Sequence, residues 1–151
     1  MKEKLEFKFL GIDFNTIGYT RNYNDQNQIV IDCVGSGKMV KQYIKKMYPN
    51  HDLKVWVKSE RYSGGSSLNI HLSKRDGSKI DQEIYEDIKS FGKTLQMGTF
   101  NGMIDMYELS DKVYHTNDGV EIEFFTKYVF VYNEPPFGSK EYEMKEELEL
   151  V

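Results

Sequence analysis

The sequence predicts an α+β fold, an antiparallel β-sheet with two amphipathic helices packed on one face. Two runs of alternating apolar and polar residues flank a Gly-Gly turn, two other segments carry apolar residues at helical spacing, and the aromatics are mostly Tyr and Phe, which favour strands. No internal repeat or low-complexity linker divides the 151 residues. We therefore expect a single domain over residues 1–135, followed by an acidic tail over residues 136–151 that is either a short frayed helix or disordered.

The first third of the chain predicts two strands and a helix. Residues 5–12 alternate apolar with charged side chains, and residues 28–34 contain a continuous Ile-Val-Ile run, so both predict strands. The polar residues 18–28 between them predict a loop. Ser36 is the expected N-cap of a helix that ends before Pro49. One face of this helix is apolar, with Met39, Val40, Tyr43, Ile44 and Met47. The lysines lie largely on the remaining surface of this helix, so the helix is amphipathic and basic.

A β-hairpin around residues 53–73 is the clearest local signal. The two alternating apolar rows are Leu53, Val55 and Val57 before the turn and Leu68, Ile70 and Leu72 after it. Tight hairpin turns need positive φ, which glycine adopts readily. Pairing across Gly64-Gly65 places Val57 opposite Leu72 and Lys58 opposite His71, with both apolar rows on one face.

The remaining chain predicts a second helix and further strands. Ser78 and Asp81 have the spacing of a capping box, and Gly92 marks the expected C-terminal end. The apolar positions of this helix are Ile80, Ile84, Ile88 and Phe91, and its outward acidic residues are Asp81, Glu83, Glu86 and Asp87. Beyond residue 94, strands are expected around the turn dipeptides Asn101-Gly102 and Asp118-Gly119 and over the aromatic run 128–132.

Charge is unevenly distributed along the chain. Residues 36–75 carry 9 basic and 2 acidic side chains, whereas residues 76–151 carry 7 basic and 17 acidic ones. Such segregation fits nucleic-acid contact, a charge-complementary protein partner, or solvated faces that neutralise one another. A single cysteine, Cys33, and no apolar leader or long apolar segment predict a cytoplasmic protein without membrane contact.

No residue pattern predicts catalysis, a metal or a cofactor. The segment Gly35-Ser36-Gly37-Lys38 follows a strand, but Asp32 and Met39 stand where a phosphate-binding loop needs Gly and Ser/Thr. The histidines are scattered, Cys33 lies in an apolar stretch, and Asp105 is one carboxylate without an evident partner. We therefore expect a binding protein, not an enzyme, with a structural cap at the first helix.

Two surfaces are candidate binding sites. The first is the polar face and tip of the hairpin, with Lys54, Trp56, Lys58, Arg61, Tyr62, Ser63, Gly64, Gly65 and His71. Basic groups beside an aromatic side chain suit a stacked base and its phosphates. Trp56 is equally compatible with a core position if a helix covers that face. The second is an acidic surface that includes Glu83, Glu86 and Asp87, whose carboxylates can mimic phosphates or simply solvate the protein.

Four segments in order resemble a domain associated with large polyvalent proteins of phages and conjugative elements. They are residues 43–49 (YIKKMYP), 61–67 (RYSGGSS), 100–105 (FNGMID) and 127–130 (KYVF). The family-like part covers residues 36–133. The family usually has Phe-Asp-Gly-Met at the third segment, so Asn101 is a departure that leaves the turn intact.

The resemblance implies a mobile-element setting in which such domains accompany anti-restriction and other anti-defence modules; it implies no established activity and no catalytic residues. Together with the small size and segregated charge, it predicts a non-enzymatic phage or mobile-element protein that binds and inhibits a host defence component, of anti-CRISPR or anti-restriction type. The alternative is a nucleic-acid-binding accessory module that uses the basic helix and the Lys54, Trp56 and Lys58 face. An exposed sheet edge would also allow a dimer.

Overall fold

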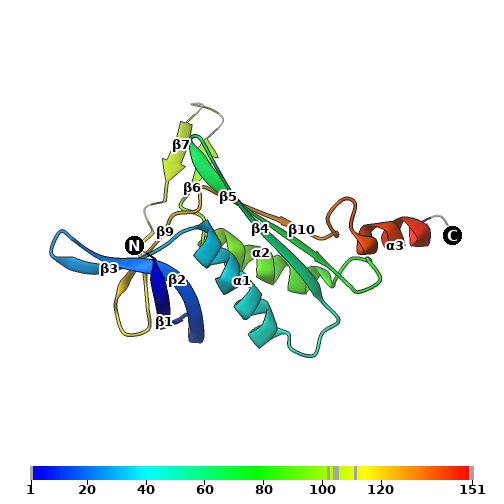
Figure 1. The fold of residues 1–151 in the computed structure, drawn as a ribbon, viewed down its shortest axis with the longest axis horizontal. Coiled ribbons are helices and arrows are strands. Elements are labelled where there is room, and N and C mark those ends of the chain that lie inside the picture. Colours follow the sequence, from blue (N-terminus) through cyan, green and yellow to red (C-terminus); the bar gives the residue numbers. More distant parts are fainter. Residues whose placement is uncertain (1, 102, 104–105, 111, 150–151) are drawn as a thin grey trace.

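A computed structural model describes residues 2–101, 103, 106–110 and 112–149, which form strands, helices and connecting turns (Figure 1). The strands are β1 (Glu3–Phe9), β2 (Ile12–Tyr23), β3 (Gln26–Ile31), β4 (Lys54–Tyr62), β5 (Gly65–Ser73), β6 (Gly98–Asn101), β7 (Met106–Leu109), β8 (Tyr114–His115), β9 (Glu121–Phe124) and β10 (Tyr128–Tyr132). The helices are α1 (Cys33–Met47), α2 (Gln82–Thr94) and α3 (Lys140–Glu149). The predicted α+β class is confirmed.

Within the described residues, the strands form three sheets and not one antiparallel sheet. Their orders are β1-β2-β3-β9-β8, β10-β5-β4 and β6-β7. The pairs β3–β9 and β5–β10 are parallel, so the prediction of a purely antiparallel sheet is wrong. Parallel neighbours need a long crossover between them, and here the partners are separated by helices and other strands. The residue patterns of neighbouring segments did not predict this parallel pairing, because the paired strands are far apart in the sequence.

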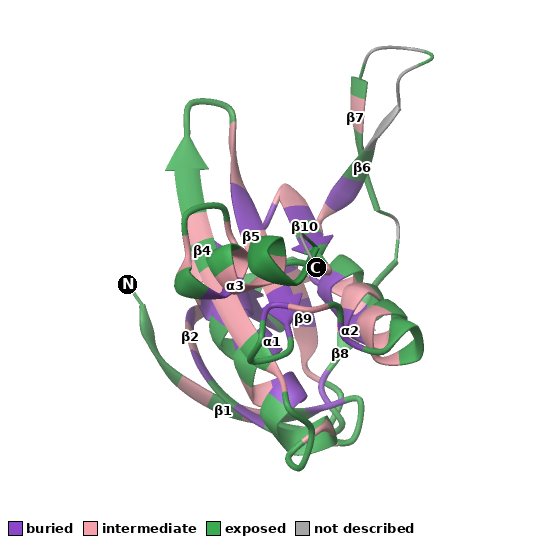
Figure 2. Cartoon of the chain, turned by 90° about the vertical axis from the view of Figure 1, so that its right-hand side faces the viewer, coloured by how far each residue is buried: buried purple, intermediate pink, exposed green. Residues whose placement is uncertain are grey.

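Helices α1 and α2 lie side by side on one face of the three-stranded sheet β10-β5-β4 (Figure 1). The ring of Tyr43 from α1 stacks on Phe91 from α2, with centroids 4.0 Å apart, and Phe14 from β2 stacks on the same ring at 5.8 Å. Figure 2 shows the buried segments where helices and strands face one another, and exposed ones on the outer side of α2 and toward the end of β4. One core therefore joins the first two sheets through the helices.

The polar stretch predicted as a loop over residues 18–28 is instead most of a β-hairpin. Strand β2 continues to Tyr23 and pairs with β3. Asn24 and Asp25 form the turn with positive φ values of 51° and 60°. Asn and Asp tolerate this conformation better than other non-glycine residues. The strand is polar because its end is exposed to solvent, so hydrophobic periodicity did not reveal it.

Helix α1 begins four residues earlier than predicted, because its N-cap is Asp32 and not Ser36. The Asp32 carboxylate accepts a hydrogen bond from the Gly35 amide at 3.1 Å, whereas Ser36 lies inside the helix and is buried. A Cβ on Gly35 would stand 2.2 Å from the carbonyl oxygen of Ile17. Glycine at this position therefore lets the first turn of α1 pack directly on β2.

The hairpin β4–β5 is present, but its register differs from the prediction by two residues. Val57 pairs with Ile70 and Lys58 with Asn69, because the turn is centred on Ser63-Gly64 and not on Gly64-Gly65. Gly64 has a φ of +90°. A shift of two residues preserves the alternation, so the apolar rows still share one face.

The later elements differ from prediction mainly at their ends. Asp81 caps α2, while Ser78 hydrogen-bonds Asp76, so no capping box forms. Gly92 lies within α2, where a Cβ would be 3.3 Å from Val129. The acidic segment 140–149 is helix α3. The turn predicted at Asn101-Gly102 and the side chain of Asp105 lie outside the described residues.

Candidate functional site

On the side opposite α1 and α2, the face of the sheet β10-β5-β4 is contacted at one end by the segment after β10 and by α3, through Glu134 beside His71 and Glu141 beside Lys54 (Figure 1). Phe130 and Tyr132 on this face are exposed, and we call it the open face. Alternate residues of a strand point to opposite faces, and Val129 and Val131 of β10 are buried against the helices. Tyr128, Phe130 and Tyr132 therefore point to the open face. From β5 and β4 this face also receives Asn69, His71, Trp56 and Lys58.

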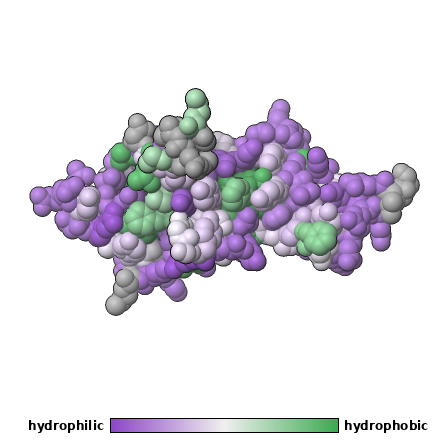
Figure 3. Space-filling model, turned by 90° about the horizontal axis from the view of Figure 1, so that it is seen from above, coloured by the Kyte–Doolittle hydropathy of each residue, from purple (hydrophilic) through white to green (hydrophobic). Residues whose placement is uncertain are grey.

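Four rings on this face form a row that we call the aromatic ladder. It consists of Tyr128, Phe130, Tyr132 and His71. Successive ring centroids are 5.9, 6.5 and 4.7 Å apart, and the interplanar angles are 13°, 27° and 24°. Phe130 is 40% exposed and Tyr132 38% exposed, so large parts of these rings contact solvent. Figure 3 shows apolar and near-neutral side chains in the middle of this otherwise hydrophilic surface.

Lysines lie beside the ladder. The Nζ atom of Lys127 is 5.7 Å from the ring centroid of Tyr128 and 5.1 Å from that of Tyr107 on β7. Lys93 from α2 reaches the edge strand β10, and its Nζ is 5.8 Å from the centroid of Phe130. Burial, followed by the charge of Lys89, lowers the pKa of Lys93. Neither Lys93 nor Lys127 forms an ion pair with a described residue. Lys93 donates a hydrogen bond to the Val129 carbonyl and Lys127 one to the Gly64 carbonyl, and no carboxylate of a described residue neutralises either charge.

The lysines predicted for this face are more strongly compensated. Lys54 forms an ion pair with Glu141 of α3 and also lies 5.4 Å from the ring centroid of Trp56. Lys58 pairs with Glu60 at 3.2 Å. Trp56 is half-buried beside His71, so neither of its two predicted environments, free surface or covered core, describes it fully.

The remaining predicted binding residues separate into two groups. Tyr62, Ser63, Gly64 and Gly65 lie at the tip of the hairpin, where a Cβ on Gly65 would be 2.7 Å from the Lys127 side chain. Arg61 points to the helix side of β4 and forms an ion pair with Asp32. The structure thus places Trp56, Lys58 and His71 on one face and Arg61 on the other, because neighbouring strand positions alternate.

The predicted acidic surface also changes. Glu83 and Glu86 are exposed on α2, but Asp87 is half-buried and accepts hydrogen bonds from the hydroxyls of Tyr43 and Tyr48. Burial, together with the hydrogen bond and charge of Asp87, raises the pKa of Tyr48 to about 12 and that of Tyr43 further. Asp87 therefore joins α1 to α2 and is not part of a solvent-facing acidic surface.

Most of the ladder residues were not predicted as binding residues. Tyr128, Phe130 and Tyr132 were recognised only as strand formers, although their alternation with Val129 and Val131 is visible in the sequence. That alternation shows that the aromatic side chains share a face. It contains no information on whether a helix covers that face or on which strand lies beside it.

Other site classes receive no support in the described part of the chain. No group of three or more His, Cys, Asp or Glu residues there is arranged to hold a metal ion. None of the described helices combines the length and apolar character needed to cross a membrane. Comparisons with protein-family models, curated proteins and solved structures find no match. The resemblance to the phage and conjugative-element domain stays a prediction.

Proposed function

We propose that this protein binds single-stranded nucleic acid on the open face of the β10-β5-β4 sheet. The aromatic ladder is the observation that carries the proposal. Exposed rings on a sheet provide stacking platforms for bases, and this mode tolerates any sequence because every base has a flat π-face. The 5.9 and 6.5 Å separations along β10 are close to twice the roughly 3.4 Å rise between stacked bases.

The charges beside the ladder fit the backbone of such a strand. Lys127 lies near the Tyr128 end, and Lys93 lies beside Phe130 at the middle. Phosphates following the stacked bases would meet these ammonium groups along the edge strand. A duplex keeps its bases stacked on one another and cannot offer them to the ladder. The proposed ligand is therefore an unpaired strand of DNA or RNA.

The first prediction concerns the exposed rings of the ladder. Phe130→Ala combined with Tyr132→Ala should weaken binding of a fluorescein-labelled 12-nucleotide single strand by at least tenfold, since stacking contributes about 1–3 kcal/mol per base. Fluorescence anisotropy with dT12 and U12 measures this affinity. A blunt duplex of mixed sequence should bind much more weakly than either strand.

Tyr23→Ala is the matched control. Tyr23 is also an exposed aromatic with a cation over it, Arg21 at 5.1 Å, but it lies at the end of the β2–β3 hairpin. We expect this variant to bind like the unmodified protein. Equal losses in both variants, or equal affinity for duplex and single strand, would contradict the proposal.

The expectation of a host defence partner rests on the resemblance and on segregated charge. No particular surface of the described residues identifies such a partner, so this function stays a prediction. A protein that occupies single strands is compatible with an anti-defence role, but the ladder concerns only the nucleic-acid contact.

A further inference from the structure

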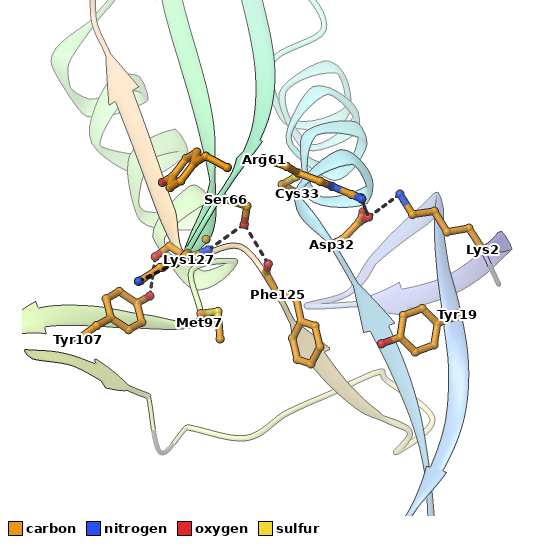
Figure 4. Close-up of a pocket in the computed structure, with 13 residues that line it drawn as sticks. Lys2, Tyr19, Asp32, Cys33, Arg61, Ser66, Met97, Tyr107, Phe125 and Lys127 are labelled. Carbon is orange, nitrogen blue, oxygen red and sulfur yellow. Dashed lines mark hydrogen bonds and ion pairs between the residues drawn. The ribbon is translucent and has the colours of Figure 1, made fainter.

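A pocket of about 860 Å³ opens beside the Tyr128 end of the ladder. Small-molecule sites typically have volumes of about 300–1,000 Å³. The pocket lies among the hairpin tip, the β7 strand, the segment between β9 and β10, and the first residues of α1 (Figure 4). In Figure 4, Lys127, Tyr107 and Met97 line one side, whereas Arg61, Asp32 and Lys2 line the other.

Two residues that line the pocket, Tyr107 and Lys127, contact Tyr128 of the ladder. The ring of Tyr107 meets that of Tyr128 edge to face, with centroids 5.5 Å apart. Lys127 lies over both rings, and its Nζ donates a hydrogen bond to the Gly64 carbonyl at 2.9 Å. A strand that follows the ladder toward Tyr128 therefore arrives at the mouth of the pocket.

The walls of the pocket combine aromatic rings with an excess of positive charge. Its rings are Tyr19, Tyr62, Tyr107 and Phe125, and its charged residues are Lys2, Arg61, Lys127 and Asp32. One carboxylate against three cations leaves a net charge of +2. Flat apolar walls suit a base, and cations suit its phosphate.

Asp32 pairs with Lys2 and Arg61 on the far side of the pocket and leaves some of their N–H donors unused. Although burial favours the neutral acid, hydrogen bonds from Lys2 and the Gly35 amide and the charges of Lys2 and Arg61 lower the pKa of Asp32, so it is ionised. It forms ion pairs with both Lys2 and Arg61 and holds the two side chains together. A guanidinium carries five N–H donors and an ammonium three, more than one carboxylate can occupy.

We infer that this pocket binds the phosphorylated terminal nucleotide of the strand that lies on the ladder. The inference rests on the proposed function. The terminal base would enter between the aromatic walls, and its phosphate would reach Arg61 and Lys2 on the side closed by α1. Lys127 would contact the preceding phosphate at the pocket mouth. Asp32 and Cys33 at the start of α1 form the wall on this side, and a chain end fits against this wall better than an internal nucleotide, which has to continue past it.

The test compares strands that differ only at their ends. A dT8 strand is prepared with a 5′-phosphate, with a 3′-phosphate and with hydroxyls at both ends, and dTMP is a fourth ligand. Unlabelled strands compete with an internally labelled probe. One of the two phosphorylated strands should bind about tenfold more tightly than the hydroxyl-ended strand, whereas dTMP alone should compete weakly because it lacks the ladder contacts.

Arg61→Gln should reduce the affinity ratio between phosphorylated and hydroxyl-ended strands to about one. The matched control is Arg75→Gln, because Arg75 also pairs with an aspartate, Asp52 at 2.7 Å, but lies at the opposite end of the hairpin. This control should keep the ratio. Lys2→Gln removes the other cation that pairs with Asp32 and should lower the ratio, while the ion pair between Arg61 and Asp32 stays in place. Thermal unfolding verifies that each variant is folded.

The outcomes separate this inference from the proposed function. If strands bind through the ladder but show no end preference, the pocket inference is wrong and the proposed function stands. If Arg61→Gln weakens all strands equally, Arg61 acts on the strand in general and not on its end, which also overturns the inference. Tight dTMP binding that depends on Arg61, without an end preference, would identify a separate nucleotide site. If no strand binds, the proposed function itself fails.

Discussion

At the scale of single residues, the most informative side chain is one whose predicted and observed environments differ. Asp87 has the spacing of an outward acidic residue on α2, yet it accepts hydrogen bonds from Tyr43 and Tyr48, which both come from α1 and its C-cap. A helical face is wide, and a carboxylate at its border is either solvated or bonded to the neighbouring helix. Only the position of α1 decided between the two.

The prediction at this scale is that Asp87→Ala destabilises the fold by about 2 kcal/mol. The substitution leaves two half-buried hydroxyls without their charged acceptor, and hydrogen bonds to charged groups contribute about 1.5–3 kcal/mol. Urea unfolding followed by circular dichroism measures the change. Glu86→Ala is the control, because Glu86 is exposed on the same turn, and its cost should stay within about 0.5 kcal/mol. Equal costs for the two variants would show that Asp87 does not join the helices.

At the scale of elements, local patterns predicted which segments are strands and helices better than where those elements begin. The hairpin β4–β5 and helices α1 and α2 follow from periodicity. The start of α1 was misplaced because two capping residues, Asp32 and Ser36, are both chemically competent. Packing of Gly35 on β2 favours the earlier one. The hairpin register was misplaced because several turns fit a run of small residues.

Helix α3 depends on contacts that no local pattern indicates. Its Glu141 is buried and pairs with Lys54, and a Cβ on Gly77 would stand 2.0 Å from the Glu141 carbonyl oxygen. We predict that Gly77→Ala displaces α3 and raises amide hydrogen exchange over residues 140–149, measured by mass spectrometry. The physical reason is a backbone clash in addition to the strain of a positive φ, +89° at Gly77.

Gly119→Ala separates the clash from the backbone strain. Gly119 has a similar φ of +92°, but nothing lies within 4 Å of its added Cβ. This variant should lose about 1 kcal/mol of stability without faster exchange in α3. Faster exchange in both variants would mean that α3 responds to overall stability and not to its contact with Gly77.

At the scale of the whole molecule, charge distribution matters more than net charge. The chain carries a net charge of −4, yet Lys93 and Lys127 lie beside the ladder without an ion pair to any described residue. Lys54 is compensated by α3, and Lys58 by Glu60. An acidic protein can therefore present a local cationic edge to phosphates, and the sum over the chain conceals it.

This distribution predicts a shallow salt dependence of strand binding. For a strand with hydroxyls at both ends, phosphate contacts by Lys93 and Lys127, at about 0.7 per contact, give a slope of log K against log salt near −1.4. Lys93→Gln with Lys127→Gln should bring the slope close to zero in anisotropy titrations between about 50 and 200 mM NaCl. Lys45→Gln with Lys79→Gln, two exposed lysines on α1 and on the segment before α2, removes the same charge elsewhere and should leave most of the slope. A steep slope that survives the first double variant would place the phosphates on another surface.

The sequence by itself determined the α+β class, the hairpin around Gly64 and the alternation that puts Tyr128, Phe130 and Tyr132 on one side of a strand. These properties depend on spacing within a few residues, where backbone geometry fixes which side chains share a face. Tertiary structure alone decided that β10 lies parallel to β5, that the aromatic side is the open one, and that Arg61 lines the same pocket as Lys127 and Tyr107. Such contacts join residues tens of positions apart, and their pairing follows from how the whole core packs.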